Sequence, residues 1–363
     1  MPESTRRYIY SCRRIVPAKR DVAQAYQIEP EELNPNAPVG EIAQNAVTLS
    51  EEGVEAYRRA SNLLSIEEEV EAFVQGEVVE RDVEDASVAG VGSIPEDADL
   101  TFLQALSLRE KQGDKAGRGV KIAVLDQGLG TVVASWLHSA GILAGAWSMI
   151  GERATDAKGD HGTHVATTAT PDGAKLYHYQ VLADHGSGGS AGIIRAIYHA
   201  VEQGADLINM SLGGSGGGEG YETAIRYARS REVLVFCAAG NTGRDEAHYP
   251  ASCPSAISVA AYDRASGAKA SFSTFNTAVD LAGSGVGVLA YLASGALGRM
   301  NGTSQATPTA AFVAALIMGI TGKRGEEVLQ AMRAGAKDMP GPATYDGSGL
   351  VQGKKSLKKL RST

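Results

Sequence analysis

The chain has 363 residues, of which 43% are hydrophobic and 21% charged, a length typical of about two domains. No stretch approaches the roughly 20 uninterrupted apolar residues of a membrane span, and the polar residues after Met1 lack the apolar core of a signal peptide. We therefore expect a soluble globular protein that does not insert into a membrane. The three cysteines are too few for a disulfide framework, which suits a reducing compartment.

Charge is distributed unevenly along the chain. Residues 1–99 carry 9 basic and 21 acidic side chains, net −12, whereas residues 100–363 carry 25 basic and 21 acidic, net +4, and together they give −8. Opposite signs suggest that the two parts dock on each other, although two independently solvated surfaces would show the same counts. The only basic run, residues 354–361, is typical of a solvated tail, so nucleic acid is not an expected partner.

The first 75 residues predict a small α+β unit. Alternation over residues 6–16 indicates a strand, and a strand, a helix and a second strand are expected between residues 45 and 73. Ser50 can cap this helix through its side-chain oxygen. Glutamates in its first turns and arginines near its end also favour the helix. Residues 76–99 are acidic and lack periodicity, and we predict that they form a linker.

The pattern changes in residues 100–363, where strands alternate with helices. Continuous apolar strands separated by helices are typical of a doubly wound parallel α/β sheet, whose reacting groups lie beyond the carboxyl ends of the strands. Asp126, Ser211 and Asn241 follow three of these strands. Strands are expected at 120–125, 176–182, 205–210 and 233–238, and helices at about 189–203, 219–230 and 303–319.

The candidate catalytic residues lie in three glycine-containing segments, residues 123–128, 159–166 and 301–308. Each residue has an ordinary interpretation when taken alone: Asp126 as a turn former, His161 and His164 as a metal pair or helix histidines, and Ser304 as a helix N-cap. In combination, Asp126, His161 and Ser304 follow one another with gaps of 35 and 143 residues. This order of Asp, His and Ser is the order found in subtilisin.

On these segments the chain resembles the subtilases, the serine proteases of the subtilisin family. The resemblance implies a serine endopeptidase in which His161 takes the proton of Ser304 and Asp126 orients the imidazole. It also implies that the Ser304 N–H and the Asn241 amide hold the oxyanion. His164 is then expected to be a structural helix histidine, and Thr303 either supports the oxyanion region or packs there. The motifs that carry the resemblance are VKIAVLDQGL, HGTHVA, INMSLGG, CAAGN, NGTSQATP and YDGSGLVQGKKSL.

The same resemblance implies how a polypeptide substrate binds, as an extended strand between two edge segments. Residues 242–249 are expected to form the floor of the primary pocket, where Asp245 or Glu246 either attracts a basic side chain or is simply solvated. The substrate preference therefore stays open. The contacts implied are Gly186, Ser187 and Gly188 on one edge, Ser211, Leu212 and Gly213 on the other, and Ala239 and Gly240 in the pocket.

The chain departs from the family after HGTHVA. Thr167 stands where the family has glycine, and only residues 167–175 lead to the next strand, where many relatives carry a longer calcium-binding loop. We therefore expect no cofactor and no calcium at the usual family position, while a weaker cation site elsewhere stays possible.

Residues 6–75 resemble the inhibitory propeptide of subtilases, most clearly over 46–73. The resemblance implies that this N-terminal propeptide assists folding and then occupies the catalytic cleft. The expected domains are a propeptide at 1–75, a linker at 76–99 and a catalytic domain at 100–363, with the cut near 73–76 or later, within 76–98. Without a signal peptide we expect a cytoplasmic location, with secretion as the alternative if a signal sequence has been removed.

Three functions are compatible with the sequence. The first is an endopeptidase made as a self-inhibited zymogen, and the second is a protease-like binding or scaffold protein silenced by its N-terminal domain. The third is a dedicated maturation protease that cuts one leader peptide. The complete set of Asp126, His161, Ser304 and Asn241 argues against the second, because a silent protein does not need all four. The sequence does not separate the first function from the third.

Overall fold

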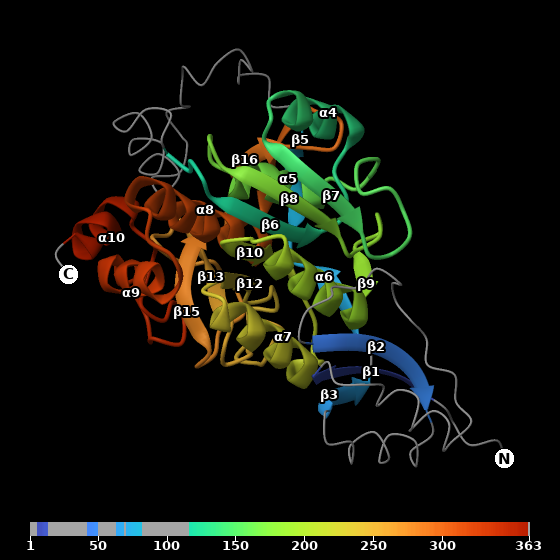
Figure 1. The fold of residues 1–363 in the computed structure, drawn as a ribbon. Helices are drawn as coiled ribbons and strands as arrows, with labels where there is room; N and C mark the ends of the chain where they lie inside the picture. The colour runs from blue at the N-terminus through green and yellow to red at the C-terminus, as the bar shows by residue number, and fades with distance from the viewer. Residues whose placement is uncertain (1–5, 14–41, 50–62, 69, 82–115, 362–363) are drawn as a thin grey trace.

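The computed structural model describes residues 6–13, 42–49, 63–68, 70–81 and 116–361 (Figure 1). Its centre is an eight-stranded sheet of order β14-β13-β12-β10-β6-β8-β7, with β15 also paired to β13. Every pairing is parallel except that of β13 with β14, which confirms the predicted α/β sheet. The strands are β6 (Lys121–Asp126), β7 (Leu143–Ser148), β8 (Lys175–Gln180), β10 (Leu207–Met210), β12 (Leu234–Ala238), β13 (Ile257–Asp263), β14 (Ala268–Lys269) and β15 (Val279–Ser284).

Helices cover both faces of this sheet (Figure 1). Side chains of successive strand residues point to opposite faces, so a strand buried on both sides must be apolar throughout. In β6, Ile122 and Val124 belong to the core beneath α8, whereas Ala123 and Leu125 belong to the core beneath α6 and α7. The helices are α4 (Thr131–Ser139), α5 (His161–Ala169), α6 (Ser190–Glu202), α7 (Gly218–Ser230), α8 (Thr303–Thr321), α9 (Gly325–Gly335) and α10 (Gly353–Leu360).

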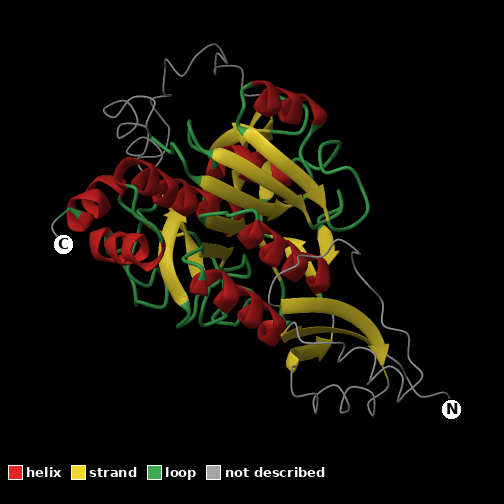
Figure 2. Cartoon of the chain, in the orientation of Figure 1, coloured by secondary structure: helices red, strands yellow, loops and turns green. Residues whose placement is uncertain are grey.

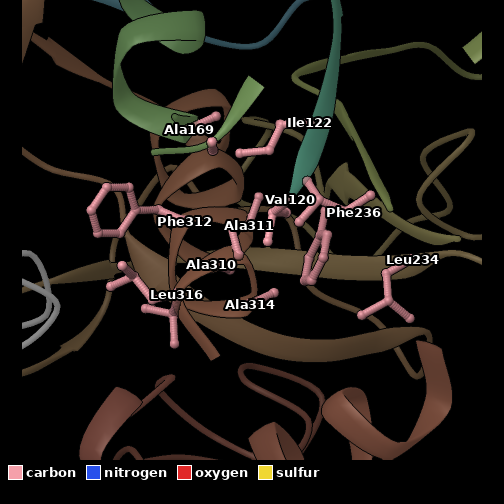
Figure 3. Packing of buried hydrophobic residues seen from close by; sticks show 14 of the residues in the cluster. Val120, Ile122, Ala169, Leu234, Phe236, Ala310, Ala311, Phe312, Ala314 and Leu316 are labelled. Atoms are coloured by element: carbon pink, nitrogen blue, oxygen red, sulfur yellow. The ribbon is translucent and has the colours of Figure 1, made fainter. Parts of the chain in front are cut away.

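The helix α8 is the centre of the larger core. Figure 3 shows the small side chains of Ala310, Ala311 and Ala314 in the same cluster as Ile122 and Phe236 of the sheet. Small residues let the helix approach the sheet closely, which fixes its N-terminal turn relative to the strand ends. Within the described part of the chain, α8 has the length and composition of a membrane span, yet 89% of its apolar window is buried inside the protein, as in a core helix.

A separate antiparallel sheet of order β2-β1-β3 lies beside α6 and α7 (Figure 1). It is formed by β1 (Arg6–Arg13), β2 (Ile42–Leu49) and β3 (Leu63–Glu68), which agree with the strands expected from the sequence. The helix expected after Ser50 lies outside the described residues.

Two small sheets join the N-terminal part of the chain to the rest of the protein (Figure 2). In one, β4 (Glu71–Val74) lies between β9 (Ser187–Gly189) and β11 (Leu212–Gly213). In the other, β5 (Glu77–Arg81) pairs with β17 (Leu297–Asn301), which also pairs with β16 (Val288–Tyr291). The prediction of a linker from residue 76 was therefore wrong for β5, because an edge more than 200 residues away supplies its pairing partner.

Candidate active site

The fold brings Asp126, His161 and Ser304 together at one edge of the sheet. Asp126 ends β6, His161 is the first residue of α5, and Ser304 lies in the first turn of α8. Their exposed fractions are 0%, 4% and 0%. The Oδ1 atom of Asp126 lies 2.7 Å from Nδ1 of His161, so the carboxylate can fix the orientation of the imidazole.

The hydroxyl of Ser304 is hydrogen-bonded to Ser211 and Gln75 rather than to His161. Its Oγ donates to the carbonyl oxygen of Ser211 at 2.8 Å and accepts from the backbone N–H of Gln75 at 2.9 Å. The Nε2 atom of His161 is buried and has no hydrogen-bond partner among the described residues. The Ser304 hydroxyl must therefore give up its hydrogen bond to Ser211 before His161 can take its proton.

The carbonyl oxygen of Gln75 binds one of the two expected oxyanion donors. The Ser304 N–H donates to this carbonyl oxygen at 2.9 Å. Oδ1 of Asn241 accepts from both the N–H and the hydroxyl of Thr303 at 2.9 Å, which leaves the amide NH2 of Asn241 as a donor. A side chain at Gly302 would overlap the same carbonyl oxygen, so glycine is required there for the chain to approach this closely.

Residues 71–74 occupy the cleft in the way expected of a substrate strand. Phe73 lies opposite Ser187 on one side and Gly213 on the other, and the Val74 N–H donates to the Gly186 carbonyl at 2.9 Å. Gly188 and Leu212 also lie opposite residues of β4, whereas Ser211 contacts Ser304 rather than β4. The side chains of β4 alternate, since Ala72 is 1% exposed and Phe73 is 48% exposed.

Two expected pocket residues bond to the protein itself. The Ala239 N–H donates to Val259, and Gly240 accepts from Thr274 through its carbonyl and donates to Thr303 through its N–H. These three backbone groups are therefore not available to hydrogen-bond the strand.

His248 is a site residue that the sequence analysis did not single out within the loop 242–249. Its ring lies 3.0 Å from the position that a Cβ atom would take at Gly240, and its Nε2 faces Gly213. The Gln75 side chain also reaches Gly213, because it donates to the carbonyls of Phe73 and Gly213. Burial lowers the pKa of His248 to about 4, so the imidazole that lies against Gly240 and Gly213 is neutral at pH 7.

Gln127 is a second residue whose role the sequence did not reveal. Its backbone N–H donates to Oδ1 of Asp126 at 2.7 Å, and its side-chain Oε1 accepts from the N–H of His161 at 3.1 Å. Its side-chain NH2 donates to the carbonyl of Asp184 at 2.8 Å. Gln127 thus binds Asp126 through its backbone, and its buried side chain connects the backbone of His161 to the loop that carries Gly186.

Two more buried histidines have structural contacts. His164 donates through Nε2 to the carbonyl of Val288 at 2.9 Å, as expected of a helix histidine, and His178 donates to the carbonyl of Gln127 at 2.7 Å. Burial lowers the pKa of each to about 4, so both are neutral at pH 7. In the described residues no group of three or more His, Cys, Asp or Glu side chains is placed to hold a metal ion.

Comparison with known proteins decides the family. Residues 117–349 match the Subtilase family. The chain is a subtilase. It is 33% identical over 255 residues to thermitase from Thermoactinomyces vulgaris, covering 67% of this chain and 90% of thermitase. It is 34% identical over 319 residues to an alkaline protease of Shouchella clausii, covering 79% and 82% of the two chains.

A solved structure described as a lanthipeptide protease has the same fold as this subtilase. The TM-score is 0.64 with 25% sequence identity, and the alignment covers 72% of this chain and 93% of the other. These relatives establish a subtilisin-type serine endopeptidase. They give no support to the expected cytoplasmic location.

Proposed function

We propose that this subtilase is a serine endopeptidase with the triad Asp126, His161 and Ser304, made as a zymogen that cuts its own chain between Gln75 and Gly76. The observation that carries the proposal is the position of the Gln75 carbonyl. The Ser304 N–H holds its oxygen at 2.9 Å, and the Gln75 N–H lies 2.9 Å from the Ser304 hydroxyl. The chain continues as a paired strand on both sides of this bond, β4 before it and β5 after it.

The geometry supports acyl transfer in the following order. The Ser304 hydroxyl turns to His161, which takes its proton as the oxygen attacks the carbonyl carbon of Gln75. The Ser304 N–H and the Asn241 amide stabilise the resulting oxyanion, and Asp126 stabilises the imidazolium. His161 then returns the proton to the nitrogen of Gly76 as the C–N bond breaks, and water hydrolyses the acyl-enzyme by the same route.

Inhibition after the cut follows from the pairing of β4. Both of its edges are hydrogen-bonded, to β9 and to β11, so the product strand remains bound by a backbone ladder. The N-terminal sheet adds a second attachment through its contacts with α6 and α7. We therefore assign residues 1–75 as an inhibitory propeptide.

A fluorophosphonate probe tests the proposed nucleophile. We expect it to label Ser304 of the full-length protein once the cleft is vacated, and to label neither His161→Ala nor a heat-unfolded sample. Failure to label the processed wild-type protein would favour the alternative of a silent binding or scaffold protein.

A dedicated maturation protease is the second candidate, and the similarity to a lanthipeptide protease favours it. A cleavage profile on a peptide library separates it from a broad endopeptidase. A single sharp motif around the cut bond supports the dedicated enzyme, whereas cuts after many residue types exclude it. Polypeptide is the substrate class in both cases. Neither candidate function depends on whether the protein is cytoplasmic or is secreted after removal of a signal sequence.

A further inference from the structure

The edge of β17 binds the chain on the C-terminal side of the Gln75–Gly76 bond. Glu77 lies opposite Asn301, Val78 opposite Met300, Glu80 opposite Arg299 and Arg81 opposite Gly298, all in antiparallel register. The register shifts between Arg299 and Met300, which leaves one residue of β5 unpaired as a bulge. This ladder starts three residues before Ser304 and leads away from it.

We propose that this edge is an extended binding site for the part of a polypeptide that follows the scissile bond, reaching six residues beyond it. The inference rests on the proposed function, because it takes Gln75–Gly76 as the bond that is cut. The other edge of β17 is already paired with β16, so the edge that β5 uses is the one open to an incoming strand. Backbone pairing of this kind recognises extended chains largely independently of their side chains.

Hydrogen bonds fix the β16–β17 hairpin on the catalytic elements. His164 of α5 donates to Val288 of β16, and the Ala293 N–H donates to Asp160, which directly precedes His161. Within the hairpin, Arg299 donates to the Gly287 carbonyl at 2.9 Å, and the Gly287 N–H donates to Asn301 at 2.7 Å. The edge is therefore held against the catalytic elements by hydrogen bonds, and its register positions a bound chain relative to Ser304.

The two small sheets together define the substrate class. A chain bound like residues 71–81 is held by two edges before the cut bond and by one edge after it. Long extended polypeptides use all three edges, whereas peptides that end near the cut bond lose the β17 edge. After the self-cut, residues 76–81 stay with the enzyme as its new N-terminus, so this strand must leave β17 before a substrate can use it.

Self-cleavage of the full-length protein tests the site directly. Adjacent residues of an antiparallel strand alternate in the direction of their N–H groups, so a double Glu80→Pro/Arg81→Pro variant removes whichever N–H faces β17. We expect the rate of cleavage at Gln75–Gly76 to fall about tenfold, equivalent to about 1.4 kcal/mol, within the range of one to two net backbone hydrogen bonds. The matched control Glu80→Ala/Arg81→Ala keeps the backbone donors and should cleave within about twofold of wild type.

The outcomes distinguish the two proposals. Cleavage of the proline variant at the wild-type rate overturns the β17 site and leaves the proposed protease intact. Absence of cleavage in the wild-type protein overturns the proposed zymogen and the β17 site with it. Equal thermal unfolding midpoints of the two double variants exclude a folding defect as the cause of a slower rate.

Quenched peptides extend the test to substrates acting in trans on the processed enzyme. A peptide with the sequence of residues 70–81 should have a kcat/KM about tenfold above that of one ending at residue 77, by the same hydrogen-bond argument. Replacement of residues 77–81 of the long peptide by alanine should retain most of this advantage. Equal kcat/KM values for the long and the short peptide would contradict the proposed site.

Discussion

Replacement of Gln127 by methionine should slow catalysis more than it impairs substrate binding. Methionine keeps the approximate volume of the side chain but loses its hydrogen bonds to the His161 N–H, at 3.1 Å, and to the Asp184 carbonyl, at 2.8 Å. Two net hydrogen bonds are worth about 2 kcal/mol. If their loss acts mainly on the position of the Asp–His pair in the transition state, kcat falls about 30-fold.

Steady-state kinetics on a long peptide measure this effect, with Gln352→Met as the control. Gln352 is also buried and its side chain donates to a carbonyl, that of Val351 at 3.0 Å, but it precedes α10 rather than contacting the catalytic pair. We expect Gln127→Met to lower kcat with little change in KM, and Gln352→Met to lower the unfolding midpoint alone. A folded Gln127→Met protein with kcat within twofold of wild type would refute the positioning role.

Three further perturbations have defined outcomes. Replacement of Asn241 by alanine removes an oxyanion donor and should lower kcat by about 10²–10³-fold with KM little changed, as steady-state kinetics can show. His248→Gly should open the primary pocket. In a series of peptides that differ in the residue before the cut bond, kcat/KM should rise for large residues relative to small ones. An unchanged order of kcat/KM values across the series would contradict this role of His248. The third perturbation is acid. The folded-state pKa values of about 4 for His164, His178 and His248 lie below the ordinary 6.5, so unfolding takes up protons at acid pH. Stability should be fully present above pH 6.5 and fall by about 2 kcal/mol per histidine at pH 5, measurable by denaturant unfolding of Ser304→Ala, and a flat profile between pH 7 and 5 would contradict it.

The secondary structure around Asp126, His161 and Ser304 has a local signal in the sequence. β6 reads as an apolar run ending at Asp126, and the glycines beside His161 and Ser304 mark tight turns next to helices, so short windows were sufficient. The rule that parallel strand ends meet at one edge of a sheet places Asp126 there, whereas His161 and Ser304 lie in the first turns of α5 and α8.

Features that depend on distant partners could not be read from the sequence. β5 reads EVVER, with only two apolar residues, and is stabilised by the open edge of β17 rather than by its own pattern. The contacts of Gln127 arise from three segments, near residues 126, 161 and 184, that only the fold brings together. The orientation of the Ser304 hydroxyl likewise depends on Ser211 and on a bound strand.

The position of the self-cut tests the central claim most directly. Intact-mass analysis of the full-length protein over hours at neutral pH, beside Ser304→Ala, measures whether and where the chain is broken. The account predicts that wild type separates into residues 1–75 and a product beginning at Gly76, while Ser304→Ala stays whole. A cut at another bond, or the same cut in Ser304→Ala, would contradict the assignment of Gln75–Gly76 as the bond held at the active site.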